Sequence, residues 1–322
     1  MEIVSEEEEP PDTTPFLRVR NIERALKLRK LYIKFEGTHA TGTQKDRISK
    51  LHARRAKNLG YDTLALASCG NYGASISYYA EKYGLGSVVA VPKGYAGERN
   101  EEIERYGSRL LLEDGKYENL VDMMRDLSND NCWYNCNPGS QNSFVDVLGY
   151  EGIAFEIIEQ LGHAPNFVAV PVGNGTTMYG IYSGFKLAYR QGRIDRIPRF
   201  IAASTEGGNP IVHSWKSGSR KIMDLDPGSI RESRSNEPLV SYHSIDGQKA
   251  LNAIYESRGF AEYVSDYEML STSMFLERTE SIQALPASSS AMAAAVRIMR
   301  RFVDYPECVV VLTGRGKPWT TQ

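Results

Sequence analysis

A continuous apolar run at residues 167–172 constrains the fold of this chain more than any other feature. Its sequence, Phe-Val-Ala-Val-Pro-Val, offers no polar side chain to water, so a strand built from it is buried on both faces. A glycine turn follows directly, and residues 176–189 then place apolar side chains at helical spacing. A buried strand that leads through a tight turn into a helix is typical of a parallel sheet covered by helices. The run therefore predicts an α/β fold.

The same alternation continues along the rest of the chain. Further strands are predicted at residues 31–35, 63–67, 88–91, 110–112, 200–203 and 309–312. Further helices are predicted at residues 48–59, 75–83, 98–106, 117–127, 152–161, 247–257, 266–275 and 289–302. The two series of units predict two domains with parallel or mixed sheets covered by helices. Residues 218–245, rich in Ser, Arg, Asp and Pro, predict a long surface excursion.

Composition excludes several other classes of protein. The chain of 322 residues has 38 Lys and Arg against 40 Asp and Glu, a balance with no electrostatic footprint for nucleic acid or an anionic membrane. No apolar stretch approaches the roughly 20 residues that span a bilayer, and the acidic N-terminus lacks the pattern of a secretory signal. We therefore expect a cytoplasmic protein. The 4 cysteines and 5 histidines form no metal-binding pattern, so no metal is expected.

Ligands of parallel sheets bind beyond the carboxyl ends of the strands, and four strand ends here carry residues suited to chemistry. After the strand at 31–35, Thr43 and Asp46 have the spacing of a helix N-cap pair, which places Lys45 in the first helical turn. The helix dipole disfavours the charged ammonium there and lowers the pKa of the lysine. A neutral amine is what Schiff-base chemistry needs. A solvated surface lysine is the alternative interpretation.

The other three strand ends are rich in glycine and hydroxyl groups. Ser68-Cys69-Gly70-Asn71 offers hydroxyl, amide and backbone N–H groups to a carboxylate or a ring oxygen. Gly173-Asn174-Gly175-Thr176-Thr177 suits a phosphate at a helix N-terminus, although it is neither a P-loop nor a dinucleotide fingerprint. Thr313 follows the last strand and could point its hydroxyl into the same cleft. Each segment taken singly is also compatible with an ordinary tight turn.

Together and in this order, the four segments resemble the fold-type II family of pyridoxal-phosphate enzymes, and within it the threonine synthases. Residues 41–47, Thr-Gly-Thr-Gln-Lys-Asp-Arg, are similar to the family's lysine segment, usually Thr-Gly-Ser-Phe-Lys-Asp-Arg. Residues 68–71 resemble its Ser-Gly-Asn loop, residues 172–175 its phosphate cradle, and residues 312–316 its closing Leu-Thr-Gly-His-Gly. The resemblance covers roughly residues 13–317.

The resemblance implies a role for each segment. Lys45 would form the Schiff base with pyridoxal 5′-phosphate (PLP) and move the α-proton of the substrate. Asn71 would bond the ring oxygen of PLP, and Thr313 would face its pyridine nitrogen. The cofactor phosphate would be held by the turn before a helix, at Gly173, Asn174, Gly175, Thr176 and Thr177. The substrate would be bound by residues of the first two segments, at Thr41, Ser68, Cys69 and Gly70.

The resemblance also implies a domain division and an assembly. Composition alone predicts a mobile acidic arm at residues 1–14, which are acidic and rich in Pro and Thr without an apolar period. Residues 15–49 and 140–322 would form a large PLP-binding domain, and residues 50–139 a small domain that closes over the substrate. A homodimer and a small amino-acid substrate are expected.

The implied reaction is that of a threonine synthase-like lyase, which converts O-phospho-L-homoserine and water to L-threonine and phosphate. One departure leaves alternatives open. Family members usually carry an arginine after Asn137-Pro138, whereas residues 139–148 hold no basic residue to bind a substrate phosphate. Either another residue binds it, Lys93 or Arg47 for example, or the substrate has no phosphate. The alternatives are a β-replacing synthase of the cysteine or cysteate synthase kind, a serine or threonine dehydratase, and a PLP-binding protein without turnover.

Overall fold

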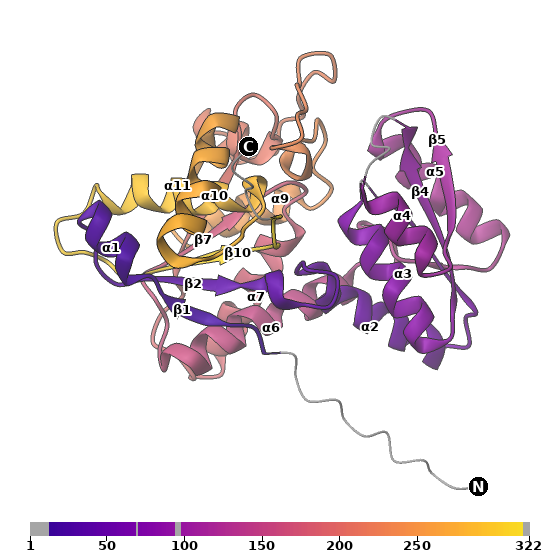
Figure 1. Ribbon diagram of the computed structural model, residues 1–322, viewed down its shortest axis with the longest axis horizontal. Coiled ribbons are helices and arrows are strands. Elements are labelled where there is room, and N and C mark those ends of the chain that lie inside the picture. Colours follow the sequence, from indigo (N-terminus) through magenta and orange to yellow (C-terminus); the bar gives the residue numbers. More distant parts are fainter. Residues whose placement is uncertain (1–12, 69, 94–97, 318–322) are drawn as a thin grey trace, which may run out of the picture.

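The structure is a computed structural model, and it describes residues 13–68, 70–93 and 98–317. Its larger sheet has six strands (Figure 1). Their order across the sheet is β1 (Phe16–Arg18), β2 (Leu31–Phe35), β10 (Cys308–Leu312), β7 (Phe167–Pro171), β8 (Arg199–Thr205) and β9 (Phe260–Val264). All neighbours are parallel except β1 and β2. Strands from early and late in the chain therefore lie side by side within one sheet, β2 next to β10.

The smaller sheet has four strands, all parallel. Their order is β5 (Arg109–Glu113), β4 (Gly86–Pro92), β3 (Thr63–Ala67) and β6 (Tyr134–Asn135). All four strands fall within the predicted small domain, residues 50–139. Figure 1 shows them on the right, apart from the larger sheet. The α/β class with two helix-covered sheets is thereby confirmed, whereas the movement of the smaller part stays a prediction.

Helices cover both sheets. The longer ones are α2 (Lys45–Asn58), α3 (Asn71–Tyr83), α5 (Tyr117–Asp130), α6 (Phe144–Leu161), α7 (Thr176–Arg190), α9 (Gly247–Glu256), α10 (Asp266–Glu280) and α11 (Pro286–Met299). Three shorter ones are α1 (Arg20–Leu26), α4 (Glu98–Arg105) and α8 (Pro210–Lys216). Because α6 packs against both α2 and α7, it joins the two halves, and one apolar core runs continuously beneath both sheets.

The sequence pattern missed several elements. β1, α1, β6, α8 and β9 were not predicted, and α6 begins at Phe144, eight residues before the predicted start at residue 152. In β9 a buried Glu262 interrupts the apolar pattern, and it is compensated by ion pairs from Lys216, Arg297 and Arg301. Residues 1–12 of the predicted arm lie outside the described residues. Thr14 at its end is buried, and its hydroxyl donates to Glu36 at 2.7 Å, so this position is anchored and not mobile.

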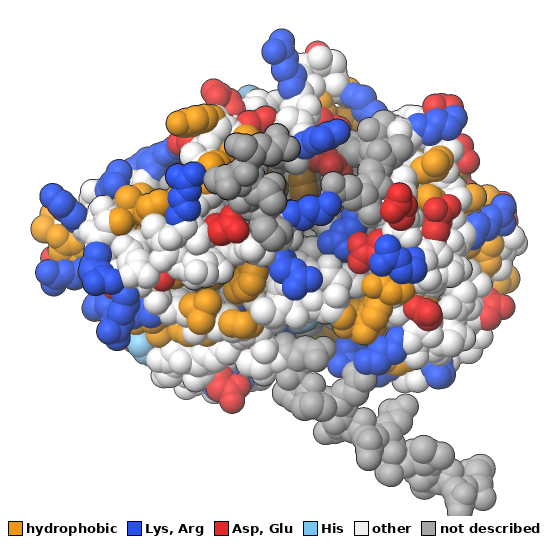
Figure 2. All heavy atoms as spheres, viewed as in Figure 1, with side chains coloured by type: hydrophobic (Ala, Val, Ile, Leu, Met, Phe, Trp, Pro, Cys, Tyr) orange, Lys and Arg blue, Asp and Glu red, His pale blue; other side chains and the backbone are white. Residues whose placement is uncertain are grey.

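The surface carries both signs of charge. Figure 2 shows basic, acidic and hydrophobic side chains spread over the face in view. None of the described helices is long and apolar enough to cross a membrane. The cytoplasmic location stays a prediction.

Candidate active site

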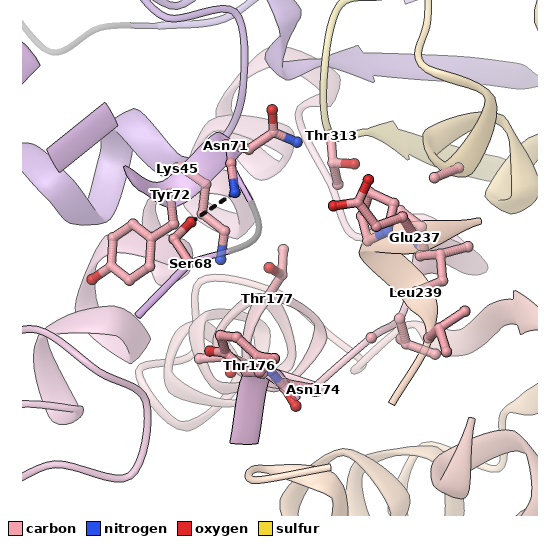
Figure 3. A pocket seen from close by; sticks show the side chains of 18 of the residues that line it. Lys45, Ser68, Asn71, Tyr72, Asn174, Thr176, Thr177, Glu237, Leu239 and Thr313 are labelled. Carbon is pink, nitrogen blue, oxygen red and sulfur yellow. Dashed lines mark hydrogen bonds between the residues drawn. The ribbon is translucent and has the colours of Figure 1, made fainter. Parts of the chain in front are cut away.

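A cavity of about 200 Å³ lies where β3, β7 and β10 end (Figure 3). It brings together ten of the residues predicted from sequence: Lys45, Ser68, Gly70, Asn71, Gly173, Asn174, Gly175, Thr176, Thr177 and Thr313. Cys69 lies outside the described residues. The four strand-end segments, three from the larger sheet and one from the smaller, therefore surround one cavity beyond the carboxyl ends of the strands.

Lys45 is the first residue of α2 and is held at the end of the larger sheet. The N–H of the preceding Gln44 donates to the carbonyl oxygen of Thr313 at 2.9 Å, which ties the helix start to the end of β10. The lysine Nζ lies 4.9 Å from the centre of the Tyr72 ring. Burial lowers the pKa of Lys45, and the negative charges of Asp146 and Asp246 partly oppose this effect. The predicted direction was right, with burial as its leading cause.

The predicted helix cap was wrong in detail. Residue Gln44 occupies the N-cap position without a side-chain hydrogen bond, and Thr43 Oγ1 accepts only a 3.3 Å bond from the Lys45 N–H. The Asp46 carboxylate is used elsewhere. It accepts the Thr41 N–H at 2.8 Å and the hydroxyls of Thr41 and Ser75. Thr41 thus supports the lysine segment from behind and does not line the cavity.

Neither basic residue suggested for a substrate phosphate reaches the cavity. Arg47 is locked into ion pairs with Glu36 and Glu156, and these carboxylates raise its pKa against the effect of burial. Lys93 is exposed and pairs with Asp114 at 2.6 Å. Among the described residues, the cationic side chains that line the cavity are Lys45 and Lys116. The stretches outside the description contain no Lys, Arg or His.

The turn before α3 is closed on itself. Ser68 Oγ accepts the N–H groups of Gly70 at 3.0 Å and Gly73 at 2.8 Å, so this serine already satisfies two donors at the helix start. Gly70 has a φ of +139°, a backbone conformation that favours glycine. Asn71 begins α3 with its side chain at the cavity (Figure 3).

The turn before α7 is packed too tightly for any side chain at its glycines. A Cβ atom on Gly173 would lie 2.5 Å from the carbonyl oxygen of Pro238, and one on Gly175 would lie 2.8 Å from Ala250 Cβ. The hydroxyl of Thr176 donates to Asp246 at 2.7 Å. The first backbone N–H groups of a helix have no intrahelical acceptor, and here they face a cavity. Such a cradle fits a phosphate group.

A third wall of the cavity was missed from the sequence. It comes from residues 230–242, part of the segment predicted as a surface excursion, and it contributes Glu237, Pro238 and Leu239. Burial, with a further contribution from Glu232, raises the pKa of Glu237 to about 7. The segment has no apolar period that could have indicated this position. The described residues contain no group of three or more His, Cys, Asp or Glu that could hold a metal ion.

Sequence comparison gives the family. Residues 8–314 match the family described as pyridoxal-phosphate dependent enzyme. Threonine synthase of Methanocaldococcus jannaschii is 33% identical over 307 residues, which are 94% of this chain and 74% of that protein. Threonine synthase of Methanosarcina acetivorans is 33% identical over 295 residues, which are 90% of this chain and 70% of that protein.

Solved structures share the fold. Maize serine racemase superimposes with a TM-score of 0.79 at 16% identity, covering 95% of this chain and 90% of that chain. A threonine deaminase from T.th. superimposes with a TM-score of 0.78 at 19% identity, covering 96% of this chain and 94% of that chain. The chain belongs to the pyridoxal-phosphate-dependent enzyme family, as a fold-type II member and a PLP-dependent lyase.

Proposed function

We propose that this enzyme has the threonine synthase reaction, in which O-phospho-L-homoserine and water give L-threonine and phosphate. One observation carries the proposal. Lys45, the Ser68–Asn71 turn and the Gly173–Thr177 cradle surround a single cavity, in a chain that matches a threonine synthase over 94% of its length. Because the family match spans residues 8–314, it includes every segment of the cavity.

The residues of the cavity fit PLP. The N–H groups from Gly173 to Thr177 would hold its phosphate, and Asn71 would bond its ring oxygen. Lys45 would hold it covalently and carry the α-proton of the substrate, for which a lowered pKa is suited. When bound, the cofactor supplies the electron sink for chemistry at the substrate α-carbon.

Other residues around the cavity would bind the substrate, tune the cofactor ring and exclude water. The turn from Ser68 to Gly70 would bind the substrate carboxylate by exchanging its internal hydrogen bonds for bonds to that anion. Thr313 would present a neutral hydroxyl to the pyridine nitrogen, which favours elimination and replacement over transamination. Residues 50–139, with the smaller sheet, would close on the substrate and exclude bulk water from the reacting carbons.

A second candidate is a β-replacing synthase or a serine or threonine dehydratase. The small number of cationic side chains around the cavity favours this candidate. Among the described residues that line it, Lys116 is the cation besides Lys45. Lys116 Nζ already donates to the carbonyl oxygen of Pro227 at 2.7 Å. A substrate phosphate normally takes an Arg or Lys partner. A substrate with a smaller, less charged leaving group would not need one.

The test is phosphate and threonine production from O-phospho-L-homoserine by the PLP-loaded protein. We expect both products from the wild type and neither from Lys45→Ala. Lys93→Ala serves as the matched lysine control, because Lys93 is exposed and does not line the cavity, and it is expected to retain activity. If the wild type releases no phosphate but acts on serine or O-acetylserine, the second candidate replaces the first.

A further inference from the structure

The wall at residues 237–239 is fixed from both sides by buried amide and hydroxyl groups. On one side, the Asn236 side chain donates to Thr205 Oγ1 at 3.2 Å and to Asp266 Oδ1 at 3.0 Å. On the other, the carbonyl oxygen of Leu239 accepts the side chains of Asn209 at 3.1 Å and Ser204 at 3.3 Å. Asn209 and Ser204 are fully buried. Glu237 is therefore held in place by the larger sheet and is not a residue of a loose loop.

The Glu237 carboxylate has a costly position. It lines the cavity, and Figure 3 shows it on the side opposite Lys45 and Ser68, directed into the cavity. No described side chain or backbone N–H donates a hydrogen bond to it. A carboxylate withdrawn from water without a partner lowers stability, so a rigid wall that keeps one there indicates a use for it.

Glu237 differs from the other titratable groups in the lining. Those groups are Lys45 on α2, Tyr72 on α3, Lys116, Tyr117 and Glu118 at the start of α5, and Glu232 and Tyr242 on its own segment. Lys116 is bound to Pro227, and its Nζ lies 5.4 Å from the centre of the Tyr242 ring. Glu232 is exposed. Glu118 is also partly buried, and burial raises its pKa. Glu237 is set apart by its fixed wall and by its place across the cavity from Lys45.

We propose that Glu237 is a second acid–base group of this enzyme, which protonates the leaving group and then activates water. The inference rests on the proposed function, an elimination from an oxygen-substituted amino acid followed by water addition. In the elimination, the bond between carbon and the leaving oxygen breaks, its electron pair stays on that oxygen, and the Glu237 carboxyl gives it a proton. In the addition, water oxygen bonds to carbon and its proton goes to the Glu237 carboxylate. The carboxyl is thereby restored.

The positions of Lys45 and Glu237 on opposite sides of the cavity suit two separate proton transfers. Lys45 serves the α-proton on one side, and Glu237 serves the leaving group on the other. A pKa of about 7 supports the role, because an acid–base group works best when its pKa lies near the working pH. It also suits a phosphate leaving group, since a protonated carboxyl can donate to a phosphate that a carboxylate would repel.

The experiment separates the two proton transfers in one reaction. Exchange of the substrate α-hydrogen in D₂O, followed by NMR, reports Lys45, and release of phosphate from O-phospho-L-homoserine reports the leaving-group step. Glu237→Gln removes the titrating group at nearly constant shape, and Glu237→Asp retains a carboxyl one methylene shorter. Glu206→Gln is the matched control, because Glu206 is exposed and does not line the cavity. The absorbance of the lysine-bound cofactor checks that each variant is folded and loaded.

We expect release by Glu237→Gln to fall by about 100-fold or more while α-hydrogen exchange stays within about threefold of the wild type. The pH profile of wild-type release should have a limb near the Glu237 pKa that Glu237→Gln lacks and Glu237→Asp keeps. Equal release by Glu237→Gln and wild type would overturn the inference and leave the proposed function standing. A parallel loss of exchange and release would also overturn it, as that indicates a structural role. A wild type that exchanges but releases nothing would overturn the proposed function, and the inference with it.

Discussion

The two glycine turns that begin α3 and α7 follow the same local plan and differ in what they leave free. Both follow the end of a parallel strand, and both place backbone N–H groups at the cavity. In the first, Ser68 already accepts two of these donors. In the second, Thr176 turns its hydroxyl away to Asp246, and the backbone donors remain open to the cavity. One turn is closed on itself, and the other is a formed anion cradle.

The space around the glycines differs in the same sense. A Cβ on Gly173 would meet the backbone carbonyl of Pro238 at 2.5 Å, whereas one on Gly70 would first meet the Arg99 side chain at 3.3 Å. A side chain in the α7 turn would overlap with backbone, whereas one in the α3 turn would make only a tight contact with the base of a side chain. This difference fits a permanently bound cofactor on one side and an exchanging substrate on the other.

Of the substitutions in the two turns, Gly173→Ala should have the largest effect, and the effect should be on affinity for PLP. Its Cβ would push against Pro238, whose segment is fixed through Leu239 by Ser204 and Asn209. We expect affinity for PLP to fall by about 100-fold or more, corresponding to about 3 kcal/mol. Titration of the cofactor-free protein with PLP, followed by absorbance, measures this.

Gly70→Ala is the matched variant on the other turn. It strains a backbone with a φ of +139°, whereas its nearest contact, Arg99 Cβ at 3.3 Å, needs only a small shift. We expect PLP affinity within about threefold of the wild type and a KM for the amino acid raised by about tenfold. If both alanines lower PLP affinity equally, the two turns do not divide cofactor from substrate.

Ser68→Ala and Thr176→Val should have smaller effects and sharpen the same contrast. Removing the Ser68 hydroxyl leaves two N–H groups without their acceptor, so the turn loses its closed form and KM should rise by about tenfold. Thr176→Val removes the donor to Asp246 Oδ2, while Lys249 still donates to Oδ1, and should weaken PLP binding by about tenfold. Steady-state kinetics and PLP titration on both variants separate the two effects. If Ser68→Ala lowered PLP affinity and Thr176→Val did not, the assignment of the α3 turn to the substrate and the α7 turn to PLP would be contradicted.

Features made by residues that are adjacent in the chain could be predicted from the sequence, whereas features that depend on contacts between distant residues were missed. Both turns and the start of α2 are local, with strand, glycines and helix adjacent in the chain, so their residues could be named in advance. Thr41 is also local, but Asp46 and Ser75 decide the direction of its hydroxyl, and Ser75 lies on another helix. The motif alone therefore gave it a place in the cavity that the structure does not.

The third wall illustrates the opposite case. Its position depends on Ser204 and Asn209, which are 30 or more residues away from Leu239 and belong to β8 and the start of α8. No period in residues 218–245 signals this contact. β9 was missed for a related reason, because the partners of its buried Glu262 lie on α8 and α11 or just after α11. Long-range polar contacts of this kind override the local pattern.

The smallest expected effect is on the free energy of unfolding. It tests whether the Glu237 carboxylate, in the wall at residues 237–239, destabilises the folded protein. Folding raises the pKa of Glu237 from 4.5 to about 7, so between these values the folded protein binds more protons than the unfolded chain. The contribution of Glu237 is therefore most favourable below pH 4.5 and becomes a penalty as the pH rises to about 7. Because the side chain is partly exposed, the penalty is about 1 kcal/mol. Glu237→Gln should remove it.

Urea unfolding of cofactor-free wild type and Glu237→Gln at pH 5, 6, 7 and 8 measures the difference, at pH values spanning roughly the range over which linkage acts. We expect the variant to gain stability over the wild type as the pH rises and to hold a constant advantage above the Glu237 pKa. A difference that does not change with pH would mean that this carboxyl does not titrate in the folded protein near neutrality. Residues 237–239 would then only line the cavity, without a titrating group. The side of the cavity near the α7 turn would in that case have no costly carboxyl to distinguish it from the side near the α3 turn.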